Sequence, residues 1–161
     1  MKTFAALALT ALALAACTPA ETPQPPADAP PTTNPPPAPT PATLNGVDLT
    51  QPLRGTGTEP FWGFEIDQTQ VKHFGPDRPD QTAPNPGPVM TATSATWTVK
   101  TADGANLKIV LTPGPCSDGM SDRVYPLNAV VDVEKPRVEQ LKGCAASKAA
   151  FDKGGESGPV Q

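Results

Sequence analysis

The chain has 161 residues, of which 23 are proline, and its 16 acidic and 12 basic side chains give a formal net charge of −4. This length predicts a single folded domain, and the excess of proline predicts an additional low-complexity segment. A mildly acidic chain lacks the basic surface that neutralises phosphates, which argues against nucleic acid as a partner and against attraction to an anionic lipid surface.

The first 17 residues, MKTFAALALTALALAAC, have the layout of an export signal. Lys2 supplies a positive start, and the apolar run over 4–14 has the length of a signal h-region and is too short to cross a bilayer. Residues 14–17, Leu-Ala-Ala-Cys, resemble the lipobox of bacterial lipoproteins. In that family the signal is cleaved before the cysteine, here Cys17, and the cysteine carries a diacylglycerol and an acyl chain such as palmitate. The alternative is an ordinary cleaved signal followed by a chance cysteine.

These features predict a signal peptide at 1–16 and a protein that is anchored to a membrane of the bacterial envelope by lipid. Several acyl chains on one residue form a stable anchor. Thr18 follows the cysteine, in place of the aspartate that retains many lipoproteins in the inner membrane. We therefore expect the outer membrane, with the protein on its periplasmic face.

A proline-rich tether follows, with eleven prolines in residues 18–43. The segment has almost nothing apolar to bury beyond alanine, so we expect it to be disordered and extended, as a polyproline II spacer. A docking track for a proline-binding partner is the alternative, but the prolines follow no fixed period. We predict a lipidated linker over 17–43, a β domain over 44–145 and a flexible tail over 146–161, with one helical turn near 145–151.

Residues 44–145 have the patterns of strands. Trp62, Phe64 and Ile66 alternate with smaller or polar residues, which is the period of a half-buried strand, and 71–74 is a short partner strand. Residues 75–88 contain five prolines. Proline cannot donate to a central strand, so this stretch predicts a long loop.

The clearest hairpin follows this loop. A two-residue turn would mismatch the apolar faces of its strands. A three-residue loop over 102–104 pairs Val99 with Leu107 and Trp97 with Ile109, and it places a glycine at the left-handed third position. We therefore predict the three-residue loop.

Two more strands are expected, over 124–133 and 137–144. The phase of the second is ambiguous, because Val138 and Leu141 fall on opposite faces. About six short antiparallel strands with one apolar face must close or stack. The predicted fold class is all-β, a small antiparallel barrel or curled sandwich closed by one disulfide. The apolar face of the strand expected over 124–133 carries Leu127, Ala129, Val131 and Val133.

With Cys17 assigned to lipid, Cys116 and Cys144 remain. Two such cysteines usually pair in the oxidising compartment of an exported protein. A bridge closing a loop of about 29 residues is worth about 3.5 kcal/mol in the chain-entropy model. The alternative is a redox or metal-binding thiol pair, which the absence of a Cys-x-x-Cys motif disfavours.

Two stretches carry a family resemblance: 57–62, Gly-Thr-Glu-Pro-Phe-Trp, and 116–126, Cys-Ser-Asp-Gly-Met-Ser-Asp-Arg-Val-Tyr-Pro, with Gly-Cys-Ala at 143–145. Together they resemble an uncharacterised family of small bacterial envelope lipoproteins, some of which sit beside META-type or lysozyme-inhibitor-type domains. The resemblance covers 53–145, and the chain departs from it by an insertion at 75–88. The family has no settled activity, so the resemblance implies a fold and a location but no mechanism.

The first stretch supplies part of a candidate binding surface. Glu59 precedes a proline, which holds it extended at the strand entrance. It is either a structural hydrogen-bond acceptor or a binding carboxylate. Phe61 and Trp62 point to opposite faces, so we expect one to fill the core and the other to be an exposed anchor for a partner.

The second stretch supplies the rest. Residues 117–122 are polar and contain glycine, which predicts a compact turn. The turn is either only structural or a recognition loop, in which Asp118 and Asp122 bind a cationic partner and Met120 is an apolar tip. The candidate surface comprises Glu59, Phe61, Trp62, Asp118, Met120, Ser121, Asp122 and Tyr125.

Catalytic and metal chemistry are not expected. His73 is the only histidine and cannot form a zinc site with two bridged cysteines. Copper(I) held by His73, Met90 and Met120 is an alternative, because thioethers are soft ligands. No Gly-x-Ser-x-Gly elbow accompanies the histidine. We predict no enzyme, no cofactor and no metal.

The predicted function is a non-enzymatic binding module for a periplasmic protein or cell-wall partner. One alternative is a lysozyme-inhibitor-like module. The other is a small-ligand carrier that uses the interior of the barrel. That alternative requires a cavity, and it fails if the following side chains fill the interior: Trp62, Phe64, Trp97 and Ile109.

Overall fold

The computed structural model describes residues 42–153 and 157–159. The predicted signal peptide, Cys17 and nearly all of the tether lie outside the described residues. Among the described residues, strands dominate, with one short helix. The strands are β1 Thr43–Leu44, β2 Val47–Asp48, β3 Leu53–Thr58, β4 Phe61–Ile66, β5 Gln70–Gly75, β6 Arg78–Pro84, β7 Val89–Met90, β8 Ala95–Lys100, β9 Asn106–Cys116, β10 Asp122–Val133, β11 Glu139–Ser147 and β12 Ser157–Pro159, and the helix is α1 Lys148–Lys153.

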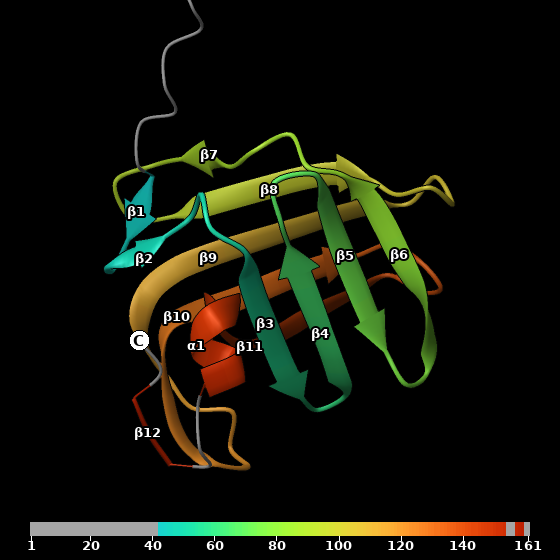
Figure 1. The fold of residues 1–161 in the computed structure, drawn as a ribbon. Helices are drawn as coiled ribbons and strands as arrows, with labels where there is room; N and C mark the ends of the chain where they lie inside the picture. The colour runs from blue at the N-terminus through green and yellow to red at the C-terminus, as the bar shows by residue number, and fades with distance from the viewer. Residues whose placement is uncertain (1–41, 154–156, 160–161) are drawn as a thin grey trace, which may run out of the picture. The chain divides into compact units, whose positions relative to one another are not determined.

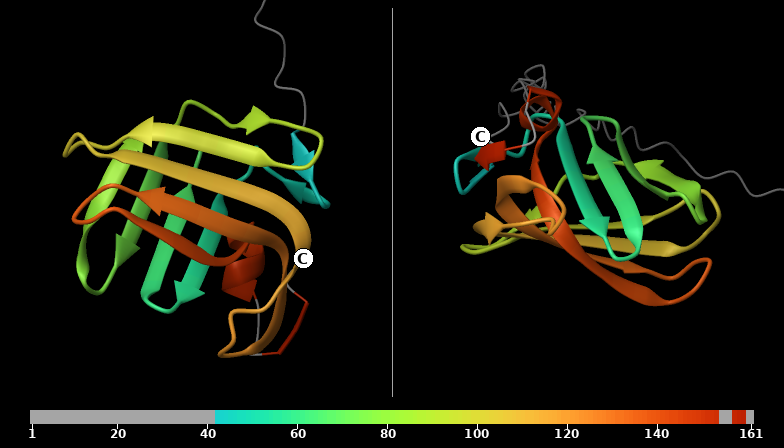
Figure 2. Two further views of the ribbon diagram at one scale, coloured as in Figure 1. Left: turned by 180° about the vertical axis from the view of Figure 1, so that it is seen from behind. Right: turned by 90° about the horizontal axis from the view of Figure 1, so that it is seen from below.

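Most strands belong to one sheet with the order β6-β5-β4-β3-β11-β10-β9-β8-β7. Neighbours along this path pair antiparallel, so two meanders, β3 to β6 and β8 to β11, are joined where β11 pairs with β3. The first meander crosses over the second, which gives the sheet two layers (Figures 1 and 2). β12 adds a parallel partner to the start of β10.

The predicted all-β fold is confirmed, as a curled sandwich rather than a closed barrel. The sheet would close only if β6 paired with β7 or with the part of β8 beyond β7, and neither pairing is present. A backbone hydrogen bond of 2.9 Å, from Ala102 N in the β8–β9 loop to Thr82 O in β6, bridges the gap. The sheet therefore curls almost fully round its core and leaves a seam between β6 and β8.

A buried ion pair spans the curl. Arg78 at the start of β6 pairs with Glu139 at the start of β11, and their side chains are only 5% and 13% exposed. Burial alone would raise the pKa of Glu139, but the hydrogen bonds and charges of Arg78 and, to a smaller extent, Arg137 outweigh it and lower that pKa. Because β6 and β11 are not neighbours in the sheet, this pair ties together two strands that only the curling of the sheet brings close.

The interior is filled by apolar side chains from both layers. The predicted alternation in β4 is confirmed, with Trp62, Phe64 and Ile66 all buried. Trp97 and Ile109 from the second layer join them in one cluster. The four side chains that would fill the interior in place of a ligand, Trp62, Phe64, Trp97 and Ile109, therefore do lie in the core.

The predicted hairpin is confirmed in register and in turn. Val99 pairs with Leu107 and Trp97 with Ile109. Thr101 N donates to Ala105 O at 2.9 Å, which leaves residues 102–104 as the loop. The glycine at its third position has φ 79°, the left-handed conformation that its lack of a Cβ permits.

The long loop predicted for 75–88 is wrong, because β6 lies within it and pairs with β5. β6 is the last strand of the sheet on this side and has a hydrogen-bonding neighbour on one side only. Pro79 and Pro84 each lack an amide donor, and an edge strand tolerates this loss as a central strand does not. The proline composition thus excluded a central strand correctly and an edge strand incorrectly.

The C-terminal part is more ordered than expected. The predicted apolar face of β10 is buried, and in β11 Leu141 is buried while Val138, before the strand, is 85% exposed. β11 continues past residue 145, where we expected the tail to begin, and ends at Ser147. The helix α1 follows with Ala150 buried and overlaps the helical turn expected near 145–151. The packed domain therefore includes much of the segment that we expected to be a tail.

Three glycines allow two aromatic rings to lie flat across the sheet. A Cβ on Gly55 would meet Phe64 at 2.2 Å, and one on Gly57 would meet Trp62 Nε1 at 2.2 Å. A Cβ on Gly143 would lie 2.1 Å from the Thr56 carbonyl oxygen and 2.8 Å from Trp62. The absence of these side chains makes room for the stacked Trp62 and Phe64 rings, whose centroids are 6.2 Å apart.

His73 makes the fold sensitive to mild acid. It is fully buried, its Nδ1 lies 3.3 Å from Gln81 Oε1, and burial lowers its pKa below the ordinary 6.5. The unfolded chain then binds this proton more readily than the folded one, so stability falls as the pH drops below about 6.5. We expect the urea midpoint to fall between pH 7.5 and 5.5, and His73→Gln to flatten this dependence. An equal slope in both proteins would contradict this origin.

Candidate functional site

The predicted disulfide is confirmed and positions the candidate site. Cys116 at the end of β9 is bonded to Cys144 in β11, with their Cα atoms 5.5 Å apart. Cys144 pairs across the sheet with Thr56 of β3. The bond therefore holds the β9–β10 connection, residues 117–121, close to β3. These residues are called the Met120 turn below.

The two motif segments meet at this end of the sheet. Thr58 ends β3, just before the turn that leads into β4, and its hydroxyl donates to the Asp118 carbonyl oxygen at 3.0 Å. This hydrogen bond links residues that are 60 positions apart. The β3–β4 turn and the Met120 turn therefore lie at the same end of the sheet, the lower end in Figure 1.

Asp118 organises the Met120 turn from within. Its Oδ1 accepts from the amides of Met120 and Ser121 at 3.0 and 2.9 Å, and its Oδ2 accepts from Tyr125 Oη at 3.1 Å. Burial alone would raise the pKa of Asp118, but the hydrogen bonds from Ser121, Met120 and Tyr125 outweigh it and hold the pKa below 3.8. The carboxylate that we expected to meet a cationic partner is thus engaged inside its own turn.

Two other members of the predicted surface are buried. Trp62 is 3% and Tyr125 is 2% exposed, so their assignment to a binding surface is wrong. Trp62 points into the glycine-lined core, and Tyr125 packs under the Met120 turn, with Cys144 in the same cluster. Of the adjacent Phe61 and Trp62, the tryptophan fills the core and Phe61 is the exposed one.

The remaining members lie on the two turns or at the adjoining starts of β4 and β10. Met120 is 68% and Phe61 is 53% exposed, Glu59 and Asp122 are exposed, and Ser121 is half-buried. Glu59 and Asp122 form no ion pair with any described residue. We call Glu59, Phe61, Met120 and Asp122 the Phe61–Met120 surface.

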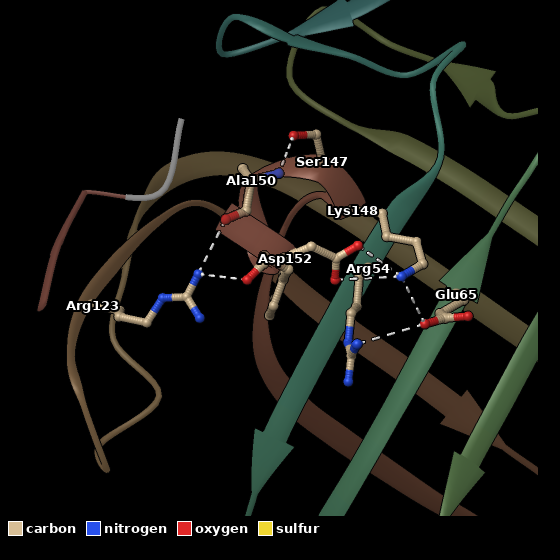
Figure 3. A network of polar contacts seen from close by, with 8 residues as sticks. Arg54, Glu65, Arg123, Ser147, Lys148, Ala150 and Asp152 are labelled. Carbon is tan, nitrogen blue, oxygen red and sulfur yellow. Dashed lines mark hydrogen bonds and ion pairs between the residues drawn. The ribbon is translucent and has the colours of Figure 1, made fainter. Parts of the chain in front are cut away.

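Sequence reasoning missed the residues that support this surface from the C-terminal side. Arg123 Nη2 donates to the carbonyl oxygens of Ala150 and Phe151, each at 3.3 Å, and so binds the helix α1 (Figure 3). The Phe151 ring lies 5.0 Å from the Tyr125 ring, centroid to centroid. An aromatic residue within an alanine-, glycine- and lysine-rich segment was the one available signal of this contact.

The opposite side of α1 carries a polar network. Lys148 lies between Asp152 at 3.0 Å and Glu65 at 3.8 Å, and Arg54 reaches the same Glu65 at 3.7 Å (Figure 3). These side chains are between 36% and 55% exposed. Such solvated pairs contribute little each. Phe151 adds cation–π contacts, with the Arg54 and Arg123 guanidinium carbons 5.7 and 5.4 Å from its ring.

A cavity that the sequence did not predict lies beside α1. Its volume is about 820 Å³, and it lies between the β1–β2 hairpin, the start of β10 and the helix. This volume is within the range of small-molecule pockets. Its apolar wall is formed by Val47, Pro52, Pro115, Val124, Pro126 and Ala149.

The described part of the chain contains no cluster of three or more His, Cys, Asp or Glu side chains that could hold a metal ion. His73 is buried, whereas Met90 and Met120 are exposed on β7 and on the Met120 turn. In the same described part, no helix has both the length and the hydropathy of a membrane-spanning segment.

Comparison with known proteins identifies no matching family model, no significantly similar curated protein and no significantly similar solved structure.

Proposed function

We propose that this chain is a non-enzymatic binding module of the bacterial envelope. In this proposal it is anchored to the membrane through lipid on Cys17 and binds a periplasmic protein or cell-wall partner through the Phe61–Met120 surface. One observation carries it: an internally hydrogen-bonded turn that is tied to β3 leaves Met120 exposed, and Phe61, which follows the adjacent β3–β4 turn, is exposed as well.

The rigidity of this surface supports a role in binding. A surface already held in shape loses less conformational entropy on association, so more of the contact energy appears as affinity. Methionine and phenylalanine supply apolar area, and methionine adapts to irregular partners. Thr58 and the disulfide hold the backbone of both turns, while Phe61 and Met120 stay exposed.

Charge indicates the kind of partner. Glu59 and Asp122 are exposed next to the apolar pair and are not neutralised by any described basic residue. A partner that places an apolar contact between basic groups would complement this arrangement, and complementary charge accelerates encounter. We therefore propose a basic partner.

Photo-crosslinking in cells that export the full chain tests the proposal. We expect a benzophenone amino acid at position 61 or 120 to give the same covalent adduct, and Asp122→Lys to reduce it. Val138, which is 85% exposed in the β10–β11 connection, is the matched control and should give no such adduct. Equal labelling from position 138, or none from 61 and 120, would refute this binding surface.

A lysozyme-inhibitor-like module is the second candidate, favoured by the same unpaired carboxylates, because lysozymes are commonly basic. Purified lysozyme should lose activity when it is titrated with the intact chain. It should keep its activity when it is titrated with the Met120→Ser variant. An unchanged rate at saturating protein would remove this candidate and leave the broader proposal standing.

A further inference from the structure

A continuous chain of side-chain contacts connects the Met120 turn to α1. Tyr125 donates from its hydroxyl to Asp118 Oδ2 at 3.1 Å, and its ring lies 5.0 Å from the Phe151 ring. The Arg123 guanidinium carbon lies 5.3 Å from the Tyr125 ring and 5.4 Å from the Phe151 ring. Tyr125 thus contacts the helix with its ring and the turn with its hydroxyl.

The helix α1, at the far end of this series of contacts, is stable only where it is docked. α1 has six residues and one buried side chain, Ala150. Helices this short are not stable alone in water, because nucleation costs more than so few hydrogen bonds return. Two of its last carbonyl oxygens are satisfied by Arg123. Such a segment is expected to open locally, at a lower free energy than the core strands.

We propose that α1 is a latch that orders the Met120 turn. With Phe151 docked, Tyr125 is held between the helix and the β10 backbone, and its hydroxyl fixes the Asp118 carboxylate that receives the turn amides. With α1 released, Tyr125 loses its ring partner, the hydroxyl is no longer held, and the turn loosens. The biological meaning of this latch rests on the proposed function, as the regulation of that binding surface.

Thermodynamic linkage predicts how a bound partner and the docked helix affect each other. Coupling between two sites is reciprocal. A partner bound to the Phe61–Met120 surface therefore stabilises docked α1, and a protein or protease that removes α1 weakens the binding surface.

Amide hydrogen exchange on the intact chain without any partner tests the latch. The informative amides are those of Met120 and Ser121, both of which donate to Asp118 Oδ1. In Phe151→Ala we expect these two amides to exchange about tenfold faster relative to core amides, a factor that corresponds to about 1.4 kcal/mol of lost coupling. Phe151→Tyr should restore the slow exchange.

Phe74→Ala is the matched control. Phe74 is half-buried on β5 and has a cation, Lys72, 5.5 Å above its ring, as Phe151 has Arg123. Phe74→Ala is expected to destabilise the protein without changing the exchange rate of the turn amides relative to that of the core amides. Tyr125→Phe should accelerate the turn amides while Phe151 stays docked.

Exchange in Phe151→Ala that rises equally at turn and core, or that leaves the turn amides unchanged, would overturn the latch. Because no partner is present, this result does not depend on the crosslinking outcome. Failed crosslinking with a positive exchange result would refute the binding surface alone.

Discussion

Gly143→Ala is expected to destabilise the folded chain by about 3 kcal/mol or more, the upper end of what overpacking a core costs. The added Cβ would lie 2.1 Å from the Thr56 carbonyl oxygen, which is backbone in the neighbouring strand β3. It would also lie 2.8 Å from the Trp62 ring. Neither neighbour is the free end of a flexible side chain, so either the β3–β11 pair must separate or the tryptophan must leave its place. Urea unfolding followed by tryptophan fluorescence measures the loss.

Gly104→Asn is the control for this experiment. Gly104 has φ 79° and no neighbour within 4 Å of an added Cβ, and asparagine tolerates that left-handed conformation. We expect a loss of less than about 1 kcal/mol there. If Gly143→Ala unfolded at the same urea concentration as the unmodified chain, the contact between Trp62 and the glycine-lined sheet would be refuted.

Removing the disulfide is expected to have an effect of similar size. The bond joins cysteines 28 positions apart, and the chain-entropy model gives about 3.5 kcal/mol for a loop of this length. Cys116→Ser combined with Cys144→Ser should therefore lower the free energy of unfolding by about that amount. The bond also holds the Met120 turn close to β3, so exchange of the turn amides should accelerate beyond the global change.

The unmodified chain in reductant is the matched comparison for the serine variant. Both lack the bond, and only the variant has altered side chains. Equal midpoints would assign the loss to the bond itself. Stability that did not change on reduction would show that the folded contacts alone hold Cys116 beside Cys144, and it would remove the disulfide from our account of the site.

Sequence reasoning succeeded where one physical effect decided the local structure. Alternation in β4 required one apolar face, and the register of the β8–β9 hairpin followed from matching such faces across a glycine-containing loop. The pairing of Cys116 with Cys144 followed from elimination and compartment. Each of these inferences needed only near neighbours or a short list of candidates.

The errors arose where the outcome depended on distant parts of the chain. Whether Pro79 and Pro84 exclude a strand depends on whether that strand lies at an edge, which the order of the whole sheet decides. Arg78 and Glu139 are 61 positions apart, and only the curl of the sheet brings them together. No periodicity within 75–88 contains that information.

The two motif segments were expected to contribute to one candidate surface, but sequence reasoning missed which of their residues serve the turn or the core instead. Both motif segments do come together, and Phe61 and Met120 are exposed. Asp118 and Tyr125 were assigned to partner binding because their residue types suit it, yet both serve the turn itself. A polar side chain does not reveal from sequence whether its hydrogen bonds are made within the chain or with a partner.

The open seam also bears on the risk of edge-to-edge association between copies of the sheet. A sheet that does not close leaves strand edges on which a second chain can add and begin an aggregate. Here one end of the sheet is β6, which begins and ends near Pro79 and Pro84 and carries the charged Asp80, and the other is β7, only two residues long. Prolines, charge and shortness each deny an incoming strand its ladder of hydrogen bonds. The prolines of β6 are therefore expected to hinder the addition of a second chain at this edge of the sheet.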